Sequence, residues 1–292
     1  MAIIGPTASG KTALALEVAR QNGGAILSLD SLALYRRIDI ASAKPTPEER
    51  GDVHHFGIDL IAPDEPFDVT MFLEEYRRAM RWTREREIPL IIVGGSGFYL
   101  KTLLEGISPL PPLNAELRQK IEELMRDRPR AYRMLERIDP HYAAGIKPAD
   151  RYRIEKGLTI ALASDQSPTD YFQAHPPRPI IEGALPIYEI ETDRGVLRER
   201  IALRTAKMLR EGLIDEVSML ECTYTRLPNP MKAIGIREVL DYLDGKLNHT
   251  QMREAIITHT AQLAKRQVTF NKSQFEGTIR GRVPQLRKRL LG

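Results

Sequence analysis

The first twelve residues contain a spacing of glycine, lysine and threonine that can bind phosphate. The segment Gly5-Pro6-Thr7-Ala8-Ser9-Gly10-Lys11-Thr12 fits the pattern G-x-x-x-x-G-K-[ST] of a phosphate-binding loop, or P-loop. In such a loop backbone N–H groups and a helix N-terminus face phosphate oxygens, the lysine neutralises charge, and the threonine hydroxyl can hold Mg²⁺. An empty glycine turn is the alternative, but the position between an apolar strand and a helix favours diphosphate or nucleotide binding.

A single carboxylate follows the next apolar run. Asp30 directly follows the strand predicted at residues 25–29. It therefore lies at the same edge of the sheet as the P-loop. It can be a metal ligand, a general base or merely an N-cap, and its strand-end position favours a functional role. The longer apolar run at residues 88–93 leads into Gly94-Gly95-Ser96, without the acidic residue that an ordinary P-loop ATPase uses for hydrolysis.

The elements that must position these residues are short apolar runs, each followed by helical periodicity. We expect strands at residues 2–4, 25–29, 88–93 and 185–190, and helices at residues 12–21 and 70–86. The remainder after the last strand is expected to be helical. This pattern predicts an α/β fold with a P-loop NTPase-like parallel sheet, formed by residues 1–112 and 180–292. Residues 113–179 are rich in Arg and Glu and are expected to form a helical insertion.

Composition excludes several classes of protein. With 42% hydrophobic and 28% charged residues, the chain is neither disordered nor collagen-like. No apolar run approaches 18 residues, so no membrane span is expected, and the single cysteine, Cys222, fits a reducing, cytoplasmic compartment. The charges behind the net value of +4 are unevenly distributed along the chain. The last 32 residues contain eight Lys and Arg and one Glu, and residues 114–157 contain eleven Lys and Arg and eight Asp and Glu. Nucleic acid is therefore a candidate partner.

The ordered motifs resemble the tRNA dimethylallyltransferases. Besides the P-loop they include Asp30-Ser31, Ala43-Lys44-Pro45, His54-His55 with Asp59, Gly94-Gly95-Ser96, Arg200-Ile201 with Arg204, Gly212-Leu213 with Glu216, Gly235 with Arg237-Glu238, and residues 262–267. The resemblance implies transfer of a dimethylallyl group from dimethylallyl diphosphate to N6 of the adenine immediately 3′ of the tRNA anticodon. Diphosphate would leave with the help of Mg²⁺, which explains the absent hydrolytic acid, and the enzyme is expected to be a monomer.

The resemblance also implies roles for single residues. Asp30 is the expected general base, Ser96 stands where threonine is usual, and Lys11 and Arg204 are expected to hold the diphosphate. The insertion is expected to bind the anticodon arm. The expected tRNA contacts are Asp30, Ser31, Leu32, Ala33, Ser96, Arg118, Tyr152, Arg153, Ile154, Glu155, Lys156, Lys232, Ala233, Ile234, Gly235, Ile236 and Arg237.

The chain departs from the usual pattern in its RNA-facing segments. The departures are at Lys156-Gly157-Leu158-Thr159, Ile236, Ala261 and Phe270, and none touches the P-loop or Asp30. Three other functions are kept open: an adenylate isopentenyltransferase acting on free nucleotide, a P-loop small-molecule kinase, and a non-catalytic RNA-binding module. The pair His54-His55 lacks a third metal ligand at suitable spacing, so packing or hydrogen bonding is expected there.

Overall fold

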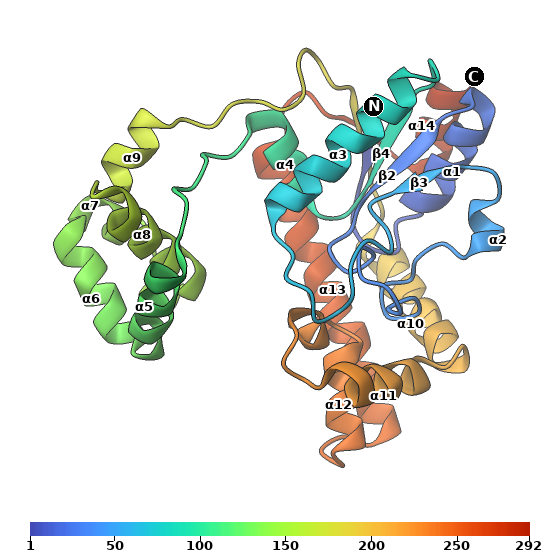
Figure 1. The fold of residues 1–292 in the computed structure, drawn as a ribbon. Helices are drawn as coiled ribbons and strands as arrows, with labels where there is room; N and C mark the ends of the chain where they lie inside the picture. Colours follow the sequence, from blue (N-terminus) through green and yellow to red (C-terminus); the bar gives the residue numbers. More distant parts are fainter. The chain divides into compact units, whose positions relative to one another are not determined.

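The computed structural model describes residues 1–292 and divides into two compact units. The core unit comprises Met1–Leu103 and Ile181–Gly292, and the insertion unit comprises Leu104–Ile180 (Figure 1). The expected insertion, residues 113–179, lies within the second of these. None of the helices combines the length and the apolar character that a membrane span requires.

Six parallel strands form the sheet of the core unit, in the order β3-β2-β4-β1-β5-β6. The strands are β1 (Ala2–Ile4), β2 (Ala25–Leu29), β3 (His55–Phe56), β4 (Leu90–Gly94), β5 (Ile187–Ile190) and β6 (Ile279–Gly281). The expected α/β fold with a parallel sheet is confirmed. The expectation that the chain is helical after residue 190 is wrong at β6, which pairs with β5 at the sheet edge.

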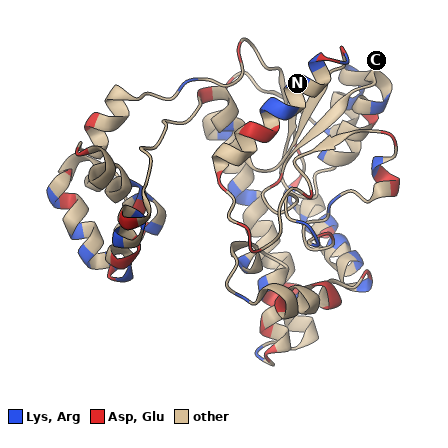
Figure 2. Ribbon diagram, viewed as in Figure 1, with Lys and Arg blue, Asp and Glu red and all other residues tan.

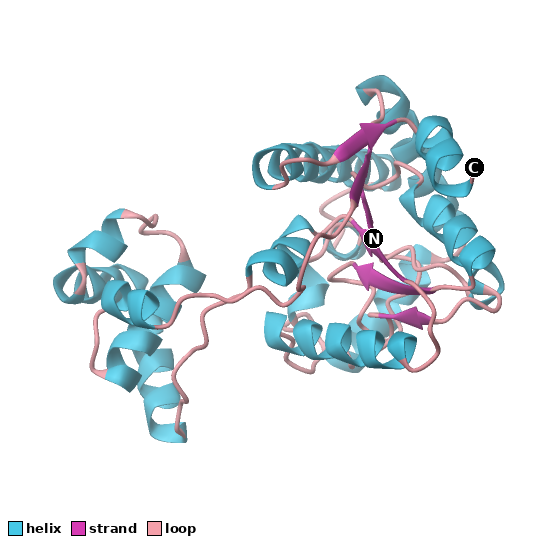
Figure 3. Cartoon of the chain, turned by 90° about the horizontal axis from the view of Figure 1, so that it is seen from above, coloured by secondary structure: helices cyan, strands magenta, loops and turns pink.

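Helices cover both faces of this sheet (Figure 3). The core-unit helices are α1 (Lys11–Asn22), α2 (Pro47–Arg50), α3 (Val69–Arg84), α10 (Arg194–Arg210), α11 (Leu213–Tyr224), η1 (Asn229–Lys232), α12 (Ile236–Leu243), α13 (His249–Gln274) and α14 (Val283–Leu291). The unit boundary falls inside α4 (Gly97–Glu105), after Leu103. The crossovers from β1 to β2 and from β2 to β4 run in opposite directions across the sheet. Crossovers between parallel strands are right-handed in nearly all proteins, and this rule places α1 and α3 on opposite faces of the sheet.

Burial explains why the central strands are apolar throughout. Every residue of β1 and β4 is buried, as expected where helices cover both faces of a parallel strand. A second apolar cluster joins helices α11 to α13 to the segment after β2, with Leu34, Ile38, Val217 and Met252 all nearly inaccessible. The loop that begins at Asp30 is therefore packed against the C-terminal helices.

The insertion unit is a set of five helices: α5 (Ala115–Arg126), α6 (Arg128–Ile138), α7 (Pro140–Ala144), α8 (Arg151–Ser164) and α9 (Pro168–Ala174). Its core includes Ile121, Leu135, Ile154 and Leu158. Gly157 on α8 lets the helices approach closely, since a Cβ there would lie 2.8 Å from a Leu135 methyl group. Both signs of charge occur along these helices (Figure 2).

Candidate active site

The P-loop connects β1 to α1 through a tight turn that contains left-handed residues. Gly5, Ala8 and Gly10 all have positive φ, and Gly10 is the N-cap of α1 with φ of 94° and no side-chain cap. The N-terminus of α1 therefore has backbone N–H groups without a capping side chain. Lys11 Nζ donates to the Pro6 carbonyl at 3.2 Å, so the lysine side chain folds back over the loop.

Three cavities border the loop. The largest of them, of about 1180 Å³, lies between the P-loop, the segment before α2, and α10. A second, of about 270 Å³, lies between the loop, Arg200 and Val283. The smallest, of about 70 Å³, is lined by Lys11, Thr12, Asp30 and Arg204 among others. The smallest cavity thus brings together residues more than 190 positions apart in the sequence. Three of the four expected catalytic residues line it, namely Lys11, Asp30 and Arg204.

Arg204 reaches this space from α10. Its Nη1 donates to Thr7 Oγ1 at 3.3 Å and its Nη2 lies 3.5 Å from the Ser42 carbonyl oxygen. Burial, with a further effect of Arg204, lowers the pKa of Lys11 to about 8, while Asp30 opposes that shift. Burial also lowers the pKa of Arg204. Two partly desolvated cations beside a P-loop form a site that an anion would stabilise.

Asp30 caps a turn rather than a helix. Its Oδ1 accepts from the Leu32 N–H at 2.9 Å and from the Ala33 N–H at 3.3 Å. These bonds fix the carboxylate at the end of β2, while Oδ2 has no hydrogen bond to the protein. Asp30 can therefore cap the turn and also act in the reaction, because capping uses Oδ1 and leaves Oδ2 free.

Ser96 lies at the sharp corner between β4 and α4, and its N–H donates to the Leu29 carbonyl at 3.1 Å. The corner has no room for side chains at two of its glycines: a Cβ on Gly94 would lie 2.5 Å from the Leu29 carbonyl oxygen, and one on Gly97 would lie 2.5 Å from the Phe270 ring of α13. Gln267 Oε1, also on α13, accepts from the Thr7 N–H at 2.9 Å. Gln267 thus fixes the P-loop relative to α13, and it leaves the Thr7 N–H unavailable for phosphate.

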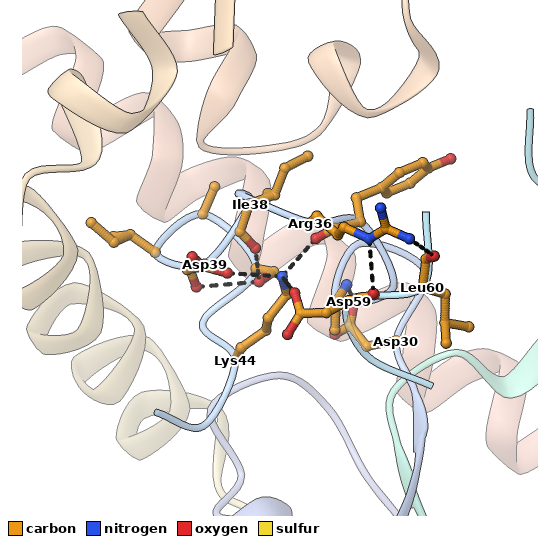
Figure 4. A network of polar contacts seen from close by, with 12 residues as sticks. Asp30, Arg36, Ile38, Asp39, Lys44, Asp59 and Leu60 are labelled. Atoms are coloured by element: carbon orange, nitrogen blue, oxygen red, sulfur yellow. Dashed lines mark hydrogen bonds and ion pairs between the residues drawn. The ribbon is translucent and has the colours of Figure 1, made fainter. Parts of the chain in front are cut away.

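A buried lysine organises the loop that starts at Asp30 (Figure 4). Lys44 Nζ, on a side chain only 3% exposed, donates to Asp39 Oδ1 at 2.9 Å, to Asp59 Oδ1 at 2.6 Å and to the Tyr35 carbonyl at 2.6 Å. Glu216 of α11 accepts from three consecutive backbone N–H groups, residues 39–41, at 2.7 to 2.9 Å. Sequence reasoning gave Lys44 and Glu216 no role beyond their place in the motifs.

The expected tRNA contacts divide by exposure. The side chains of Ala33, Ile154 and Ile236 are buried, so only their backbone could reach RNA. Exposed residues are Ser31, Arg118, Tyr152, Arg153, Glu155, Lys232 and Arg237. Ile236, at the position of a usual aromatic residue, is a core residue of α12.

Some of the basic residues near the C-terminus form ion pairs with carboxylates of the core unit. Arg280 Nε lies 2.9 Å from the buried Glu189 Oε2, and Arg287 Nε lies 2.7 Å from Glu17 Oε2. Arg237 is held by the buried Glu238, which also accepts from His259 of α13 at 2.7 Å. The expected basic surface is therefore smaller than the residue count suggests.

The oxygen donors of the small cavity fit Mg²⁺ only together with a phosphate ligand. No group of three His, Cys, Asp or Glu could hold a metal ion, and the hard donors at the cavity are the Asp30 carboxylate and the hydroxyls of Thr7, Thr12, Ser28 and Ser42. Of these, the Thr7 hydroxyl accepts from Arg204 and the Ser42 hydroxyl donates to the Ile38 carbonyl. Mg²⁺ is commonly bound by one or two protein oxygens together with substrate phosphates and waters. This donor set matches that mode.

Comparisons with known proteins identify the family. A family model described as "IPP transferase" matches residues 33–274, and one described as "Isopentenyl transferase" matches residues 1–59. A tRNA dimethylallyltransferase of a Sulfurovum species is 52% identical over the whole chain, covering 97% of that protein. The chain belongs to the tRNA dimethylallyltransferase family. A second member, from Nautilia profundicola, is 49% identical over 99% of the chain and 98% of its own length.

A solved structure supports the fold. A eukaryotic dimethylallyltransferase described as acting on tRNA matches 97% of the chain and 73% of its own chain, with a TM-score of 0.85 at 24% identity. The family resemblance read from the motifs is confirmed.

Proposed function

We propose that this chain transfers the dimethylallyl group of dimethylallyl diphosphate to N6 of the adenine immediately 3′ of a tRNA anticodon. Membership of the family supports the reaction class. The observation that carries the assignment of residues is the meeting of Lys11, Thr12, Asp30 and Arg204 around one cavity at the P-loop.

The reaction forms the bond from adenine N6 to C1 of the donor and breaks the bond from C1 to oxygen, so diphosphate leaves with the electron pair. Lys11, Arg204 and the α1 N-terminus stabilise the charge that develops on the diphosphate. The free oxygen of Asp30 accepts the proton lost from N6, while its other oxygen keeps the turn in place. Ser96 supplies a hydroxyl beside the acceptor.

Thr12 is the residue that would hold Mg²⁺, which would supply further positive charge to the diphosphate oxygens. The exposed basic residues of the insertion unit and of α12 are assigned to tRNA phosphates. Such contacts position RNA without reading its sequence. The target adenine must be unstacked to reach a partly buried carboxylate, and this costs less in a loop than in a duplex.

The decisive assay offers labelled dimethylallyl diphosphate or labelled ATP to the protein with unmodified tRNA or with AMP. Transfer of the prenyl label to tRNA alone supports the proposal. Label on AMP instead would indicate an adenylate isopentenyltransferase, and phosphate transfer from ATP would indicate a kinase. A monomer in the cytoplasm completes the proposal; the single cysteine, exposed and unpaired, agrees with a reducing compartment.

A further inference from the structure

The segment between Arg37 and Lys44 follows a backbone path that most residues avoid. Arg37 and Ala43 have φ of 63° and 48°, in the left-handed region, although neither is glycine. Such conformations are costly for a residue with a side chain, and they persist only where the surrounding structure holds them. The contacts that hold this segment therefore decide the position of whatever it carries.

One of these contacts is a carboxylate from a distant helix, α11. Glu216 Oε2 accepts from the N–H groups of Asp39 and Ile40 at 2.9 and 2.7 Å. Its Oε1 accepts from the Ala41 N–H at 2.9 Å. Successive backbone N–H groups that converge on one anion form a nest. Because both oxygens of Glu216 are bonded, its carboxylate fixes the path of the backbone through this nest.

The residues that follow the nest form part of the wall of the proposed donor site. Residues 42–45 line the 70 Å³ cavity together with Lys11 and Arg204. The Ser42 carbonyl oxygen also lies 3.5 Å from Arg204 Nη2. Ser42 directly follows the nest of residues 39–41, so a change in the nest moves this wall and its contact with Arg204.

Lys44 also holds this segment, but it does not take the place of Glu216. Its ammonium reaches Asp39 only through a side chain that is 65% exposed, and its other partners are Asp59 and the Tyr35 carbonyl. An exposed side chain can rotate without moving its backbone. The bonds to Glu216 are therefore the side-chain contacts that act directly on the backbone of residues 39–41.

We propose that Glu216 is a positioning residue of the donor site. Its carboxylate keeps residues 39–41 in the conformation that places the wall of residues 42–45 beside Arg204, so the cavity accepts diphosphate without rearrangement. Glu216 lines neither this cavity nor the 1180 Å³ cavity, and it acts only through the backbone. This inference rests on the proposed function, because it requires diphosphate at the P-loop.

Calorimetric binding of inorganic diphosphate at a fixed Mg²⁺ concentration tests the inference without using turnover. Glu216→Ala removes both acceptors, and Glu216→Gln keeps one oxygen. Glu221→Gln is the matched control, because Glu221 lies on the same helix and pairs with Arg226. Hydrogen exchange of the amides of residues 39–41 is measured in the same proteins, since it reports whether the nest has opened.

The apparent affinity falls in proportion to the fraction of molecules whose site is ready to bind. A hydrogen bond to a charged group shifts an equilibrium roughly tenfold, so the loss of three should leave at most about one molecule in ten with the native segment. Glu216→Ala should therefore bind diphosphate roughly tenfold more weakly or worse, with faster exchange at residues 39–41. Glu216→Gln should lie between this variant and the wild type, and Glu221→Gln should match the wild type.

Unchanged diphosphate affinity of Glu216→Ala overturns the inference, whether or not residues 39–41 exchange faster. So does a lower binding stoichiometry at unchanged affinity, because it would indicate partial misfolding and a purely structural role. If Glu216→Ala does not fold, as judged by circular dichroism, Glu216→Gln decides by the same criteria. Failure of the wild type itself to bind diphosphate would instead refute the proposed donor site, and the inference with it.

Discussion

Lys11 makes donor binding depend on pH in a way that can be calculated. Its pKa, lowered to about 8 mainly by burial, means that the lysine of the free enzyme is about one tenth neutral at pH 7, half neutral at pH 8 and about nine tenths neutral at pH 9. An anionic diphosphate favours the charged form. Binding is therefore expected to take up about 0.1, 0.5 and 0.9 proton at these three pH values.

The sign follows from the direction of the shift. Because the charged lysine binds the donor, affinity for the donor is highest below pH 8. Above pH 8 the affinity decreases, and the decrease approaches a factor of ten for each pH unit. The terminal phosphate of an organic diphosphate is fully ionised above about pH 7.5, so the ligand adds little to this dependence.

Isothermal titration calorimetry in buffers of different ionisation enthalpy measures the proton uptake directly. Lys11→Met should bind the donor weakly and without the uptake at pH 8 and 9. Lys207→Met is the matched control, because Lys207 lines the larger cavity but forms an ion pair with Glu211 at 3.5 Å. Proton uptake near zero at pH 9 in the wild type would refute the assignment of Lys11 as a desolvated cation waiting for an anion.

Three further predictions concern other parts of the account. Arg204→Ala should lower the single-turnover rate at saturating donor, since Arg204 is assigned to the leaving group; a change confined to tRNA affinity would reassign it to RNA binding. Lys44→Met should lower the free energy of unfolding by about 2 kcal/mol, because two partly exposed carboxylates lose their cation. Urea unfolding followed by Trp82 fluorescence checks this, and an unchanged midpoint would contradict it. tRNA affinity should fall steeply with salt in a filter-binding titration, and a flat response would count against the exposed basic residues as phosphate contacts.

Local patterns predicted the elements that hold the P-loop. The strands at residues 2–4 and 25–29 have the predicted bounds because an unbroken apolar run between turn residues suffices for a buried parallel strand. β3 and β6 escaped prediction because neither is an apolar run: β3 is His55-Phe56 and β6 is Ile279-Arg280-Gly281, and both are recognised only by pairing with a neighbouring strand. The edge strand β6 even carries Arg280, which pairs with the buried Glu189.

The side chains that support the site could not be recognised from spacing. Gln267 contacts Thr7 across 260 positions, and Glu216 binds backbone N–H groups about 175 positions away. Both residues belong to the motifs that carry the family resemblance, but the local sequence does not indicate which distant segment they contact. Lys44 also stood in one of these motifs, but its burial and its contacts with Tyr35, Asp39 and Asp59, which the sequence does not show, give it its structural role.

The central claim is that Asp30 is the base for prenyl transfer to tRNA, and Asp30→Asn tests it most directly. An asparagine oxygen can keep the bonds to Leu32 and Ala33, so the turn survives while the proton acceptor is lost. Single-turnover transfer of labelled dimethylallyl to unmodified tRNA is measured alongside tRNA affinity, and mass spectrometry locates the product nucleoside. The account predicts prenylation of the adenine 3′ of the anticodon by the wild type, with at least about a 100-fold lower rate for Asp30→Asn and tRNA affinity within a few-fold. A near-normal rate in the variant would contradict it.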